Sequence, residues 1–430
     1  MRQFTNYGTV ALVLGLAVLA CLFAPSSSAS TIIVGTCIAG THTTTIQQAI
    51  NLSTLGGTIE ICPGTYPEQL SISEQLTIKG VTNGAEDAVV IVPPSTGLVQ
   101  NATDVDTGVP IAAQIVIKQP SVGVVIENLT VDGTGNGITG CTPDLEGILF
   151  QNGSGTVEHV AVRNEVLSSS LSGCQSGQGI FVQTGHGEAT SVIVENSSVH
   201  NYQKNGITGN DPNTYIEIEN NDVQGAGVVA VPGAAQNGIQ IAFGATGKAT
   251  GNLVIDNVYG DPTIAASCGI LLYDASENSS IQVSTNTIGN TQIAVALITD
   301  ESGGSSQYDD GVTVNSNKIF GTSTYDAIDA CTNGNTITSN TVMNSGESAV
   351  HLDASCSGSG NNTGNNNSVS SNTITEAGCA GILEDSGTSG ETIGTNTFYT
   401  VPNMTLTGAC SGGSYTRLGE SRGYKPSPRR

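Results

Sequence analysis

Apolar residues recur along this chain in short runs that follow a glycine or an alanine, and their spacing defines a repeat. Each run opens with Gly or Ala, continues with Ile or Val, and alternates inward and outward side chains as a β-strand does. The step occurs at Gly147-Ile148, Gly179-Ile180, Gly206-Ile207, Gly238-Ile239, Gly269-Ile270, Ala294-Val295, Ala327-Ile328, Ala349-Val350 and Gly381-Ile382. Because the intervals run from 22 to 33 residues, the pattern predicts a stacked repeat.

A second apolar strand lies inside each interval and ends in a polar turn, as in residues 191–196, 214–220 and 311–317. In several repeats an asparagine stands two residues before the next apolar residue. These asparagines are Asn286, Asn317, Asn340, Asn372 and Asn396. Asn tolerates the left-handed backbone of a turn, and its amide can bond the coils above and below. The pattern therefore predicts an asparagine ladder.

A unit of about 22 residues cannot bury its own apolar face, so it must stack on its neighbours. Strands stacked in this way lie about 4.8 Å apart. The composition agrees with many short strands joined by turns, because the chain has 55 glycines, 11% charged residues and no tryptophan. The sequence thus predicts an all-β solenoid.

This repeat resembles the right-handed parallel β-helix of the pectin lyase-like superfamily over roughly residues 56–401. The resemblance implies a single-stranded right-handed parallel β-helix solenoid with a short N-terminal capping helix. It implies less about function, because the superfamily includes lyases, esterases, hydrolases, epimerases, adhesins and surface proteins without known catalysis.

The segment before the repeats is similar to the N-terminal module of the same superfamily. Residues 44–52 predict a short amphipathic helix with Thr44 or Thr45 as its N-cap. Its apolar face carries Ile46, Ala49 and Ile50. Such a helix would cover the first coil and block end-to-end strand pairing.

Residues 57–68 and 76–80 are similar to the opening coils of pectin methylesterases. We interpret Gly64, Tyr66 and Glu68 as structural residues that shape a turn, because non-esterase members share that turn.

The chain divides into five predicted segments. Residues 1–30 are typical of a secretory signal peptide, because Arg2 precedes an apolar run and Ser28-Ala29-Ser30 offers a small-residue cleavage site. Residues 31–55 are the N-terminal cap, 56–401 the parallel β-helix, 402–416 a C-terminal cap and 417–430 a basic disordered tail. No later segment is long and apolar enough to span a bilayer. We expect a secreted monomer, extracellular or periplasmic.

Charge narrows the choice of partners. Residues 31–415 hold six basic and 35 acidic residues, a net charge of −29. Such a surface repels nucleic acid, anionic lipid and polyuronates unless cations bridge them. A polysaccharide, either neutral or held through Ca²⁺, remains open as a partner.

Nine of the ten cysteines follow the signal peptide, and disulfides are the default in an exported chain. The predicted pairs are Cys37 with Cys62, Cys141 with Cys174, Cys331 with Cys356 and Cys379 with Cys410. Cys268 is left over and is expected to be buried.

Signatures of the superfamily's enzymes are mostly absent. No pectin methylesterase signature occurs, and of the polygalacturonase pattern only Asp309-Asp310 and residues 185–187 are present, in the wrong order. We interpret both as loop sequence. A pectate lyase needs a basic residue that removes a proton, but the one arginine of residues 31–415, Arg163, is expected to pair with Glu195 across coils.

Aligning the repeats on the Gly/Ala step brings titratable residues onto one outward face. Asp329 and His351 share the first outward position in neighbouring coils, and Asp353 and Asp385 share the second. One interpretation is catalytic: His351, Asp329 and Asp353 form the site, and Asp329 holds His351 in its tautomer as a general base.

Two other interpretations of this face stay open. Asp353 and Asp385 provide the oxygen atoms that Ca²⁺ prefers, and Asp274 and Asp300 would extend the acidic row. The third interpretation is a solvated polar face without a specific role.

Aromatic rings that hold sugars would have to come from Tyr or Phe, because the chain has no tryptophan. Phe181, Phe243 and Tyr273 lie on or just after equivalent strands and are candidates for a shallow glycan groove.

The leading hypothesis is a secreted β-helix protein that binds an extracellular polysaccharide and, if catalytic, cleaves it as a lyase or hydrolase with the help of calcium. The alternative is a non-catalytic cell-surface or adhesive solenoid, favoured by the missing signatures and by the Gly-, Ser- and Asn-rich run of residues 355–372. A periplasmic metal-delivery protein is a third class, disfavoured because the five histidines and three methionines do not cluster.

Overall fold

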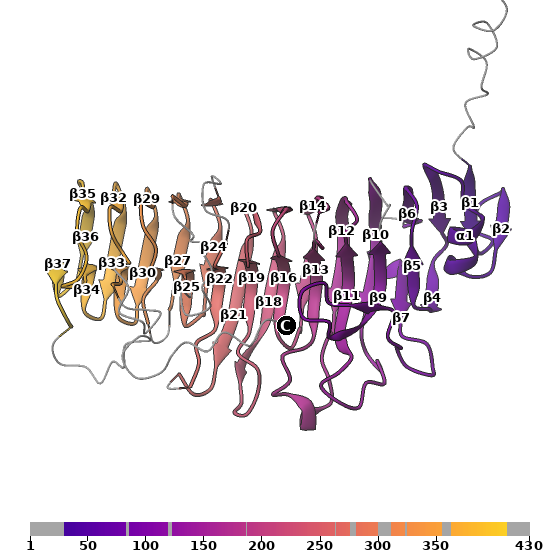
Figure 1. The fold of residues 1–430 in the computed structure, drawn as a ribbon, viewed down its shortest axis with the longest axis horizontal. Helices are drawn as coiled ribbons and strands as arrows, with labels where there is room; N and C mark the ends of the chain where they lie inside the picture. Colours follow the sequence, from indigo (N-terminus) through magenta and orange to yellow (C-terminus); the bar gives the residue numbers. More distant parts are fainter. Residues whose placement is uncertain are drawn as a thin grey trace, which may run out of the picture.

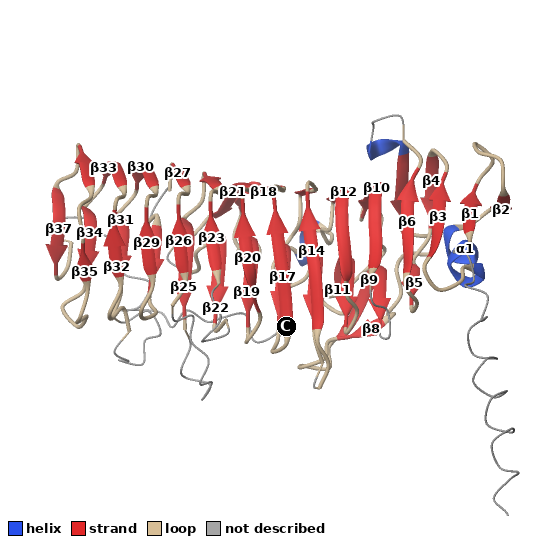
Figure 2. Ribbon diagram, turned by 90° about the horizontal axis from the view of Figure 1, so that it is seen from above, coloured by secondary structure: helices blue, strands red, loops and turns tan. Residues whose placement is uncertain are grey.

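Short parallel strands stack in a row from one end of the molecule to the other, as the repeat predicts (Figure 1). The computed structural model describes residues 30–82, 86–118, 123–185, 187–262, 264–275, 281–299, 311–322, 325–354 and 363–410. In this described part the strands form two hydrogen-bonded sheets, and the view from above shows the same order of coils (Figure 2).

Sheet B is the sheet that carries the Gly/Ala steps. Its strands pair in parallel except for β8, which runs antiparallel to β9. They are β5 (Leu70–Ile72), β8 (Ala102–Thr103), β9 (Pro110–Lys118), β11 (Asp144–Gln151), β13 (Gln178–Gln183), β16 (Asn205–Asn210), β19 (Asn237–Ala242), β22 (Cys268–Tyr273), β25 (Ile293–Ile298), β28 (Ile328–Ala330), β31 (Ser348–Leu352), β34 (Ala380–Glu384) and β37 (Asn403–Thr407).

Sheet A provides the other sides of the coils. At its N-terminal end are β1 (Thr31–Val34), β2 (Thr41–Thr43), β3 (Gly57–Ile61), β4 (Gly64–Pro67), β6 (Leu76–Gly80), β7 (Val89–Val92), β10 (Val124–Asp132) and β12 (Gly155–Arg163). One row then follows: β14 (Thr190–Glu195), β17 (Thr214–Glu219), β20 (Thr246–Thr250), β23 (Gln282–Ser284), β26 (Thr313–Asn315), β29 (Thr336–Thr338), β32 (Ser368–Ser370) and β35 (Thr392–Ile393). The second row is β15 (Ser198–His200), β18 (Asp222–Val229), β21 (Leu253–Tyr259), β24 (Thr287–Gly289), β27 (Lys318–Phe320), β30 (Thr341–Ser345), β33 (Thr373–Ala377) and β36 (Thr397–Tyr399).

Small residues at the Gly/Ala step allow the coils to stack closely. A Cβ atom on Gly206 would lie 2.5 Å from the carbonyl oxygen of Gly238, and one on Gly147 would lie 2.6 Å from that of Gly179. A larger side chain at these positions would push the coils apart. The step is therefore a packing requirement as well as a marker of the repeat.

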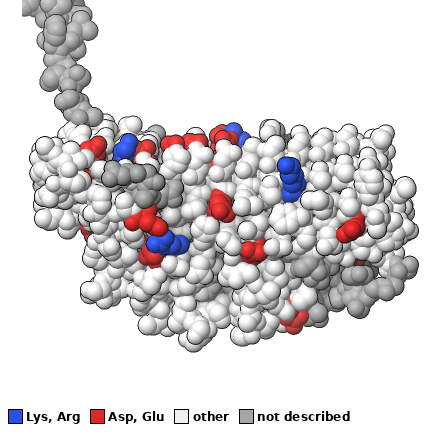
Figure 3. Space-filling view, turned by 180° about the vertical axis from the view of Figure 1, so that it is seen from behind, with Lys and Arg blue, Asp and Glu red and all other residues white. Residues whose placement is uncertain are grey.

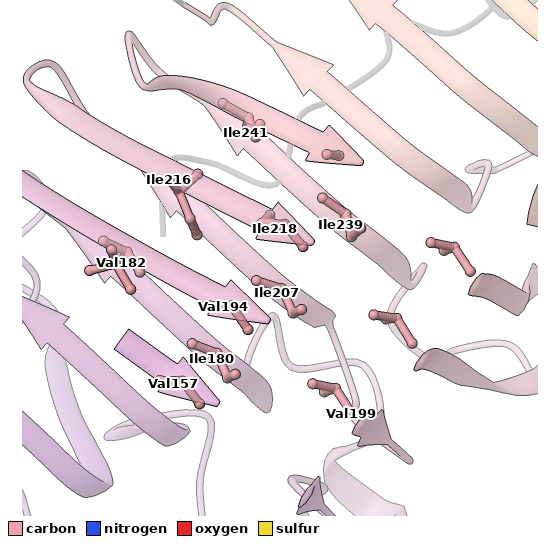
Figure 4. Packing of buried hydrophobic residues seen from close by; sticks show 14 of the residues in the cluster. Val157, Ile180, Val182, Val194, Val199, Ile207, Ile216, Ile218, Ile239 and Ile241 are labelled. Carbon is pink, nitrogen blue, oxygen red and sulfur yellow. The ribbon is translucent and has the colours of Figure 1, made fainter. Parts of the chain in front are cut away.

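Inward side chains of both sheets form one continuous apolar core. Figure 4 shows part of it, where Ile and Val residues of successive coils stack on one another. The labelled residues are all fully buried: Val157, Ile180, Val182, Val194, Val199, Ile207, Ile216, Ile218, Ile239 and Ile241. Burial of each such side chain contributes roughly 1.5–3 kcal/mol, so the stacked core is the main source of stability.

The predicted asparagine ladder is present and is longer than expected. It runs through Asn221, Asn252, Asn286, Asn317, Asn340, Asn372 and Asn396. In each step the backbone N–H and the side-chain Nδ2 of one asparagine both donate to the Oδ1 of the next, at 2.9–3.0 Å. The left-handed conformation belongs to the residue before the ladder position, as at Thr285, Ser316 and Ser339.

The N-terminal helix α1 (Ile46–Leu52) covers the first coils, as predicted. Thr45 is its N-cap and accepts a hydrogen bond from the backbone N–H of Gln48 at 3.2 Å. The carboxylate of Glu68 accepts from the N–H groups of Ile46 and Gln47 at 2.8 and 2.9 Å. Glu68 thus anchors the positive end of the helix. Two short 3₁₀ helices, η1 (Glu86–Ala88) and η2 (Ser169–Leu171), lie in loops.

Three predicted disulfides are present: Cys37–Cys62, Cys141–Cys174 and Cys379–Cys410. Cys331 is also disulfide-bonded, and its predicted partner Cys356 lies outside the described residues. Cys268 is a free, buried thiol, as expected, and burial raises its pKa to about 12.

The expected ion pair between Arg163 and Glu195 is wrong. Arg163 binds Asp87 and Asp132, each at 2.9 Å. The reason is the register of the strands. β12 bends at His159, whose φ is +53°. Before the bend Glu158 pairs with Glu195, and after it Arg163 pairs with His200.

No helix among the described residues is long and apolar enough to cross a membrane. Acidic side chains are scattered over the face in Figure 3, with only a few Lys and Arg among them. Residues 1–29 and 411–430 lie outside the described part, so the predicted signal peptide and basic tail stay predictions.

Candidate functional site

Four titratable residues of sheet B meet where β28, β31 and β34 lie side by side. Asp329 pairs with His351 in the register of β28 and β31, as the repeat alignment predicts. Asp353 and Asp385 follow the last paired residues of β31 and β34. Ligand atoms of His351, Asp353 and Asp385 all lie within 4.8 Å of one another.

His351 is held by two carboxylates on opposite sides of its ring. Nδ1 lies 3.0 Å from Oδ2 of Asp326, and Nε2 lies 3.4 Å from Oδ1 of Asp385. The sequence hypothesis assigned the orienting role to Asp329, but Asp326 makes this contact. Asp326 immediately precedes the step residue Ala327, a position that the alignment did not count as outward.

Backbone donors fix both carboxylates that contact His351. Asp326 Oδ1 accepts a hydrogen bond from the N–H of Ser348 at 2.8 Å. Asp385 Oδ2 accepts from the N–H of Ala354 at 3.3 Å. Because rigid neighbouring coils provide these donors, the imidazole is preorganised rather than free to rotate.

The whole cluster is buried. The exposed fractions are 2% for Asp329, 3% for Asp353 and Asp385, and 5% for Asp326 and His351. The interpretation of this face as merely solvated is therefore wrong. Charges removed from water need partners, and His351 has two of them in Asp326 and Asp385.

Burial by itself lowers the pKa of His351, but Asp326, Asp385 and Asp353 outweigh it, and the pKa is raised well above its ordinary value. At neutral pH the ring is an imidazolium. Both of its N–H groups then donate to carboxylates. It has no free lone pair and cannot serve as a general base in this state.

Burial also raises the pKa of Asp329 well above its ordinary value, and the nearby charge of Asp353 adds to this effect. This shift favours the neutral form of the Asp329 carboxyl, which can donate a proton. A buried carboxyl group with a raised pKa is a candidate for the general acid of a reaction.

The remaining predicted metal ligands do not join the cluster. Asp274 is buried further toward the N-terminus, where its Oδ1 accepts from the hydroxyl of Thr299 at 3.1 Å. Asp300 lies outside the described residues. Cys331 lies close to Asp329 and Asp353, but its disulfide removes the thiolate that a metal would bind.

The aromatic candidates form no open platform. Phe181 is 1% exposed and belongs to an apolar cluster that includes Leu149 and Ala102. Tyr273 is 3% exposed and contacts Phe243 edge to face, with ring centroids 5.5 Å apart. Phe243 alone of the three keeps partial exposure. The sequence correctly indicated the outward face of sheet B, but loop residues cover that face.

A protein-family profile described as "Right handed beta helix region" matches residues 146–307. No curated protein matches the chain by sequence. Among solved structures, the catalytic domain of a GH87 α-1,3-glucanase is 13% identical, with a TM-score of 0.57, covering 91% of this chain and 70% of that one.

Two other similar structures have known sources. The A-module of a mannuronan C-5 epimerase from Azotobacter vinelandii is 15% identical, with a TM-score of 0.52, covering 85% of this chain and 95% of that one. A GH136 lacto-N-biosidase from Eubacterium ramulus is 11% identical, with a TM-score of 0.54, covering 87% and 68%. At these identities the likeness concerns the fold. The chain is a right-handed parallel β-helix protein.

Proposed function

We propose that this protein is a secreted enzyme that binds an extracellular polysaccharide and cleaves it at the cluster of Asp329, Asp353 and His351. The observation that carries this proposal is the pair of buried carboxyl groups of Asp329 and Asp353, whose oxygen atoms lie within 4.8 Å of each other. Burial raises the pKa of Asp329, which supports its role as the acid. The fold supports it in a general way, because the similar structures include a glucanase and an epimerase of polysaccharides.

The chemistry of the cluster favours hydrolysis over elimination. In this proposal Asp329 protonates the oxygen of the leaving sugar, and Asp353 activates water or attacks the sugar. Water supplies the hydroxyl group of one product and the proton of the other. A lyase needs a base to remove a proton from the sugar ring, and His351 is already protonated.

Calcium is part of the proposal as a ligand of the same carboxylates. Asp353 and Asp385 provide oxygen atoms of the kind that Ca²⁺ prefers, and Asp329 lies close to Asp353. The charge of His351 competes with the ion. If Ca²⁺ binds here, a chelator lowers the Tm of the wild-type chain but not that of Asp353→Asn; an unchanged wild-type Tm removes calcium from the proposal.

The disulfides and the acidic charge of the chain support its export and its choice of a neutral glycan as partner. The three disulfides fit an oxidising compartment outside the cytoplasm. The acidic body disfavours nucleic acid and favours neutral glycans over polyuronates. We also propose that the chain acts as a monomer.

The test is an activity screen of the purified chain on neutral glycans, pectate and alginate, with Ca²⁺ or a chelator. New reducing ends without unsaturated-product absorbance would indicate hydrolysis. Asp329→Asn should then lose at least about 10²-fold in kcat, since a positioned acid contributes that much. Asp222→Asn, a change on the exposed surface, is the control and should keep full activity.

A second candidate, a non-catalytic adhesive solenoid, is favoured by the burial of the cluster, where no acid exceeds 5% exposure. Substrate can reach these groups only if the face opens. Glycan binding without any product, at every substrate and pH tested, would select this second function.

A further inference from the structure

A second group of buried acids lies toward the N-terminus, where the turn after β12 meets β11. Glu165 and Glu146 are each 1% exposed. Among the described residues, neither carboxyl oxygen of Glu165 has a hydrogen-bond partner. Glu146 accepts one hydrogen bond through Oε1, from Gln178 at 3.1 Å, and its Oε2 has none. This group plays no part in the proposed active site.

Two glycines make room for the Glu165 carboxyl. A Cβ on Gly133 would lie 2.5 Å from Oε2 of Glu165, and one on Gly147 would lie 3.0 Å from Oε1. The carboxyl therefore fills the space between two coils.

The charged groups that face these two acids are acids themselves. Asp132, at the end of β10, faces Glu165, and Glu146 is faced by Asp144, Asp104 and Glu165. The nearest cation along the chain, Arg163, is engaged with Asp87 and Asp132. Burial, together with these like charges, raises the pKa of both glutamates well above the ordinary value.

A metal ion does not explain this group. In the described part of the chain, the sets of three ligand atoms that could hold an ion all lie in the His351 cluster. Glu165 and Glu146 belong to none of them. A neutral carboxylic acid remains the state that burial without hydrogen bonds allows.

Glu165 lies near the start of the loop that joins β12 to β13 and packs over sheet B. This loop, residues 164–177, which we call the strap, contains η2 and is bonded to the preceding loop by the Cys141–Cys174 disulfide. Leu167 of the strap packs on Ala112 and Leu145, outward residues of β9 and β11. The Glu165 carbonyl accepts from the N–H of Gln203. The strap is thus fastened at both ends and across its middle.

We propose that Glu165 and Glu146 form a pH-sensitive latch, which keeps the strap closed while both acids are neutral and releases it when rising pH ionises them. Ionised, the two side chains would repel each other and Asp132, and they would draw water into the space between the coils. The strap would then lift from β9 and β11, and the outward face of sheet B would open there.

The sign follows from the direction of the pKa shifts. The pKa values of Glu165 and Glu146 are both raised in the folded chain. The two neutral acids therefore stabilise the closed strap fully below the ordinary glutamate pKa, about 4.3. The stabilisation is lost as the pH rises through the raised values. The strap is therefore closed in acid and open in alkali.

The test is hydrogen exchange of the full chain over about pH 4 to 9, read on peptides from residues 164–177 and corrected for the intrinsic pH dependence of exchange. The wild-type strap should lose protection as the pH rises, while peptides of β29 and β32 stay protected. Local readout is needed because His351 and Asp329 also affect global stability.

Glu165→Gln keeps the shape without the ionisable group, so its strap should show no loss of protection across the range. Glu74→Gln, at an exposed glutamate, should behave like the wild type. A wild-type strap whose protection does not change with pH would overturn the proposal, and so would a Glu165→Gln strap that opens as the wild type does.

If Glu165→Gln does not fold, Glu146→Gln provides the test. It removes one of the repelling charges, so the loss of strap protection should move to higher pH than in the wild type; no movement would count against the latch.

Discussion

His351 is the residue on which the candidate site depends. Its imidazolium lies between Asp326 and Asp385, all in a region that water hardly reaches. A buried charge of this kind is tolerated because its partners are in place, and removing one partner leaves the others uncompensated.

Asp326→Asn tests this dependence. The variant keeps the shape of the side chain but removes the charge that faces Nδ1 of His351, so we expect the free energy of unfolding to fall by roughly 3–5 kcal/mol. Urea unfolding followed by circular dichroism measures it. Asp222→Asn serves as the control, and equal stabilities of the two variants would contradict the role given to Asp326.

The pH dependence of stability gives a second prediction at this scale. Because the pKa of His351 is raised in the folded chain, its contribution is complete below its ordinary pKa, about 6.5, and is lost as the pH rises through the raised value. His351→Gln should be less stable than the wild type near pH 6, and the difference should shrink toward pH 10. A difference that stays constant with pH would argue that packing, not charge, is responsible.

The sequence predicted the register of Asp329 with His351 because the Gly/Ala step fixes alignment between coils. It missed Asp326, because an alternating pattern assigns outward positions only after the step and says nothing of the residue before it. Glu146 and Gln178 occupy the same position in earlier coils. Counting that position would have revealed Asp326.

Among the elements, the asparagine ladder joins successive turns of the solenoid. Each amide, as at Asn317, pairs with a backbone N–H and a carbonyl of the preceding coil and with the asparagine side chain of the following coil. These groups are buried, so loss of the amide leaves several of them unpaired.

Asn317→Ala should therefore destabilise the chain by roughly 1–3 kcal/mol, since the N–H of Asn286 and the carbonyl of Val283 each lose a partner. Asn315→Ala, two residues earlier and half-buried, is the matched control and should cost much less. Chemical denaturation of both variants measures the difference. Similar losses would show that the ladder has no special role.

Strand pattern predicted which side chains face outward, but not what lies over them. Phe181 was expected on an open groove, yet it is buried in an apolar cluster with Leu149 and Ala102. The loop after β8 reaches β13, where the side chain of Gln183 accepts a hydrogen bond from the N–H of Val105. Such cover comes from loops of irregular sequence, whose path the repeat does not encode. The elements were therefore predictable, and the accessibility of the face was not.

At the scale of the whole molecule, α1 covers the N-terminal end, and we expect it to prevent association there. Ala49 lies on its buried face, and Gln48 is exposed. Ala49→Lys should displace the helix, uncover the edge of the first coil and promote concentration-dependent association. Light scattering after size exclusion measures it, with Gln48→Lys as control. A monomeric Ala49→Lys chain at high concentration would show that α1 is not needed for this protection.

The other end of the described solenoid is built differently. There β35, β36 and β37 each pair with a strand on one side only. A duplicated coil could therefore be added after β37 without disturbing α1, the ladder or the His351 cluster. The number of coils on this side can therefore differ while α1 and the His351 cluster keep their places.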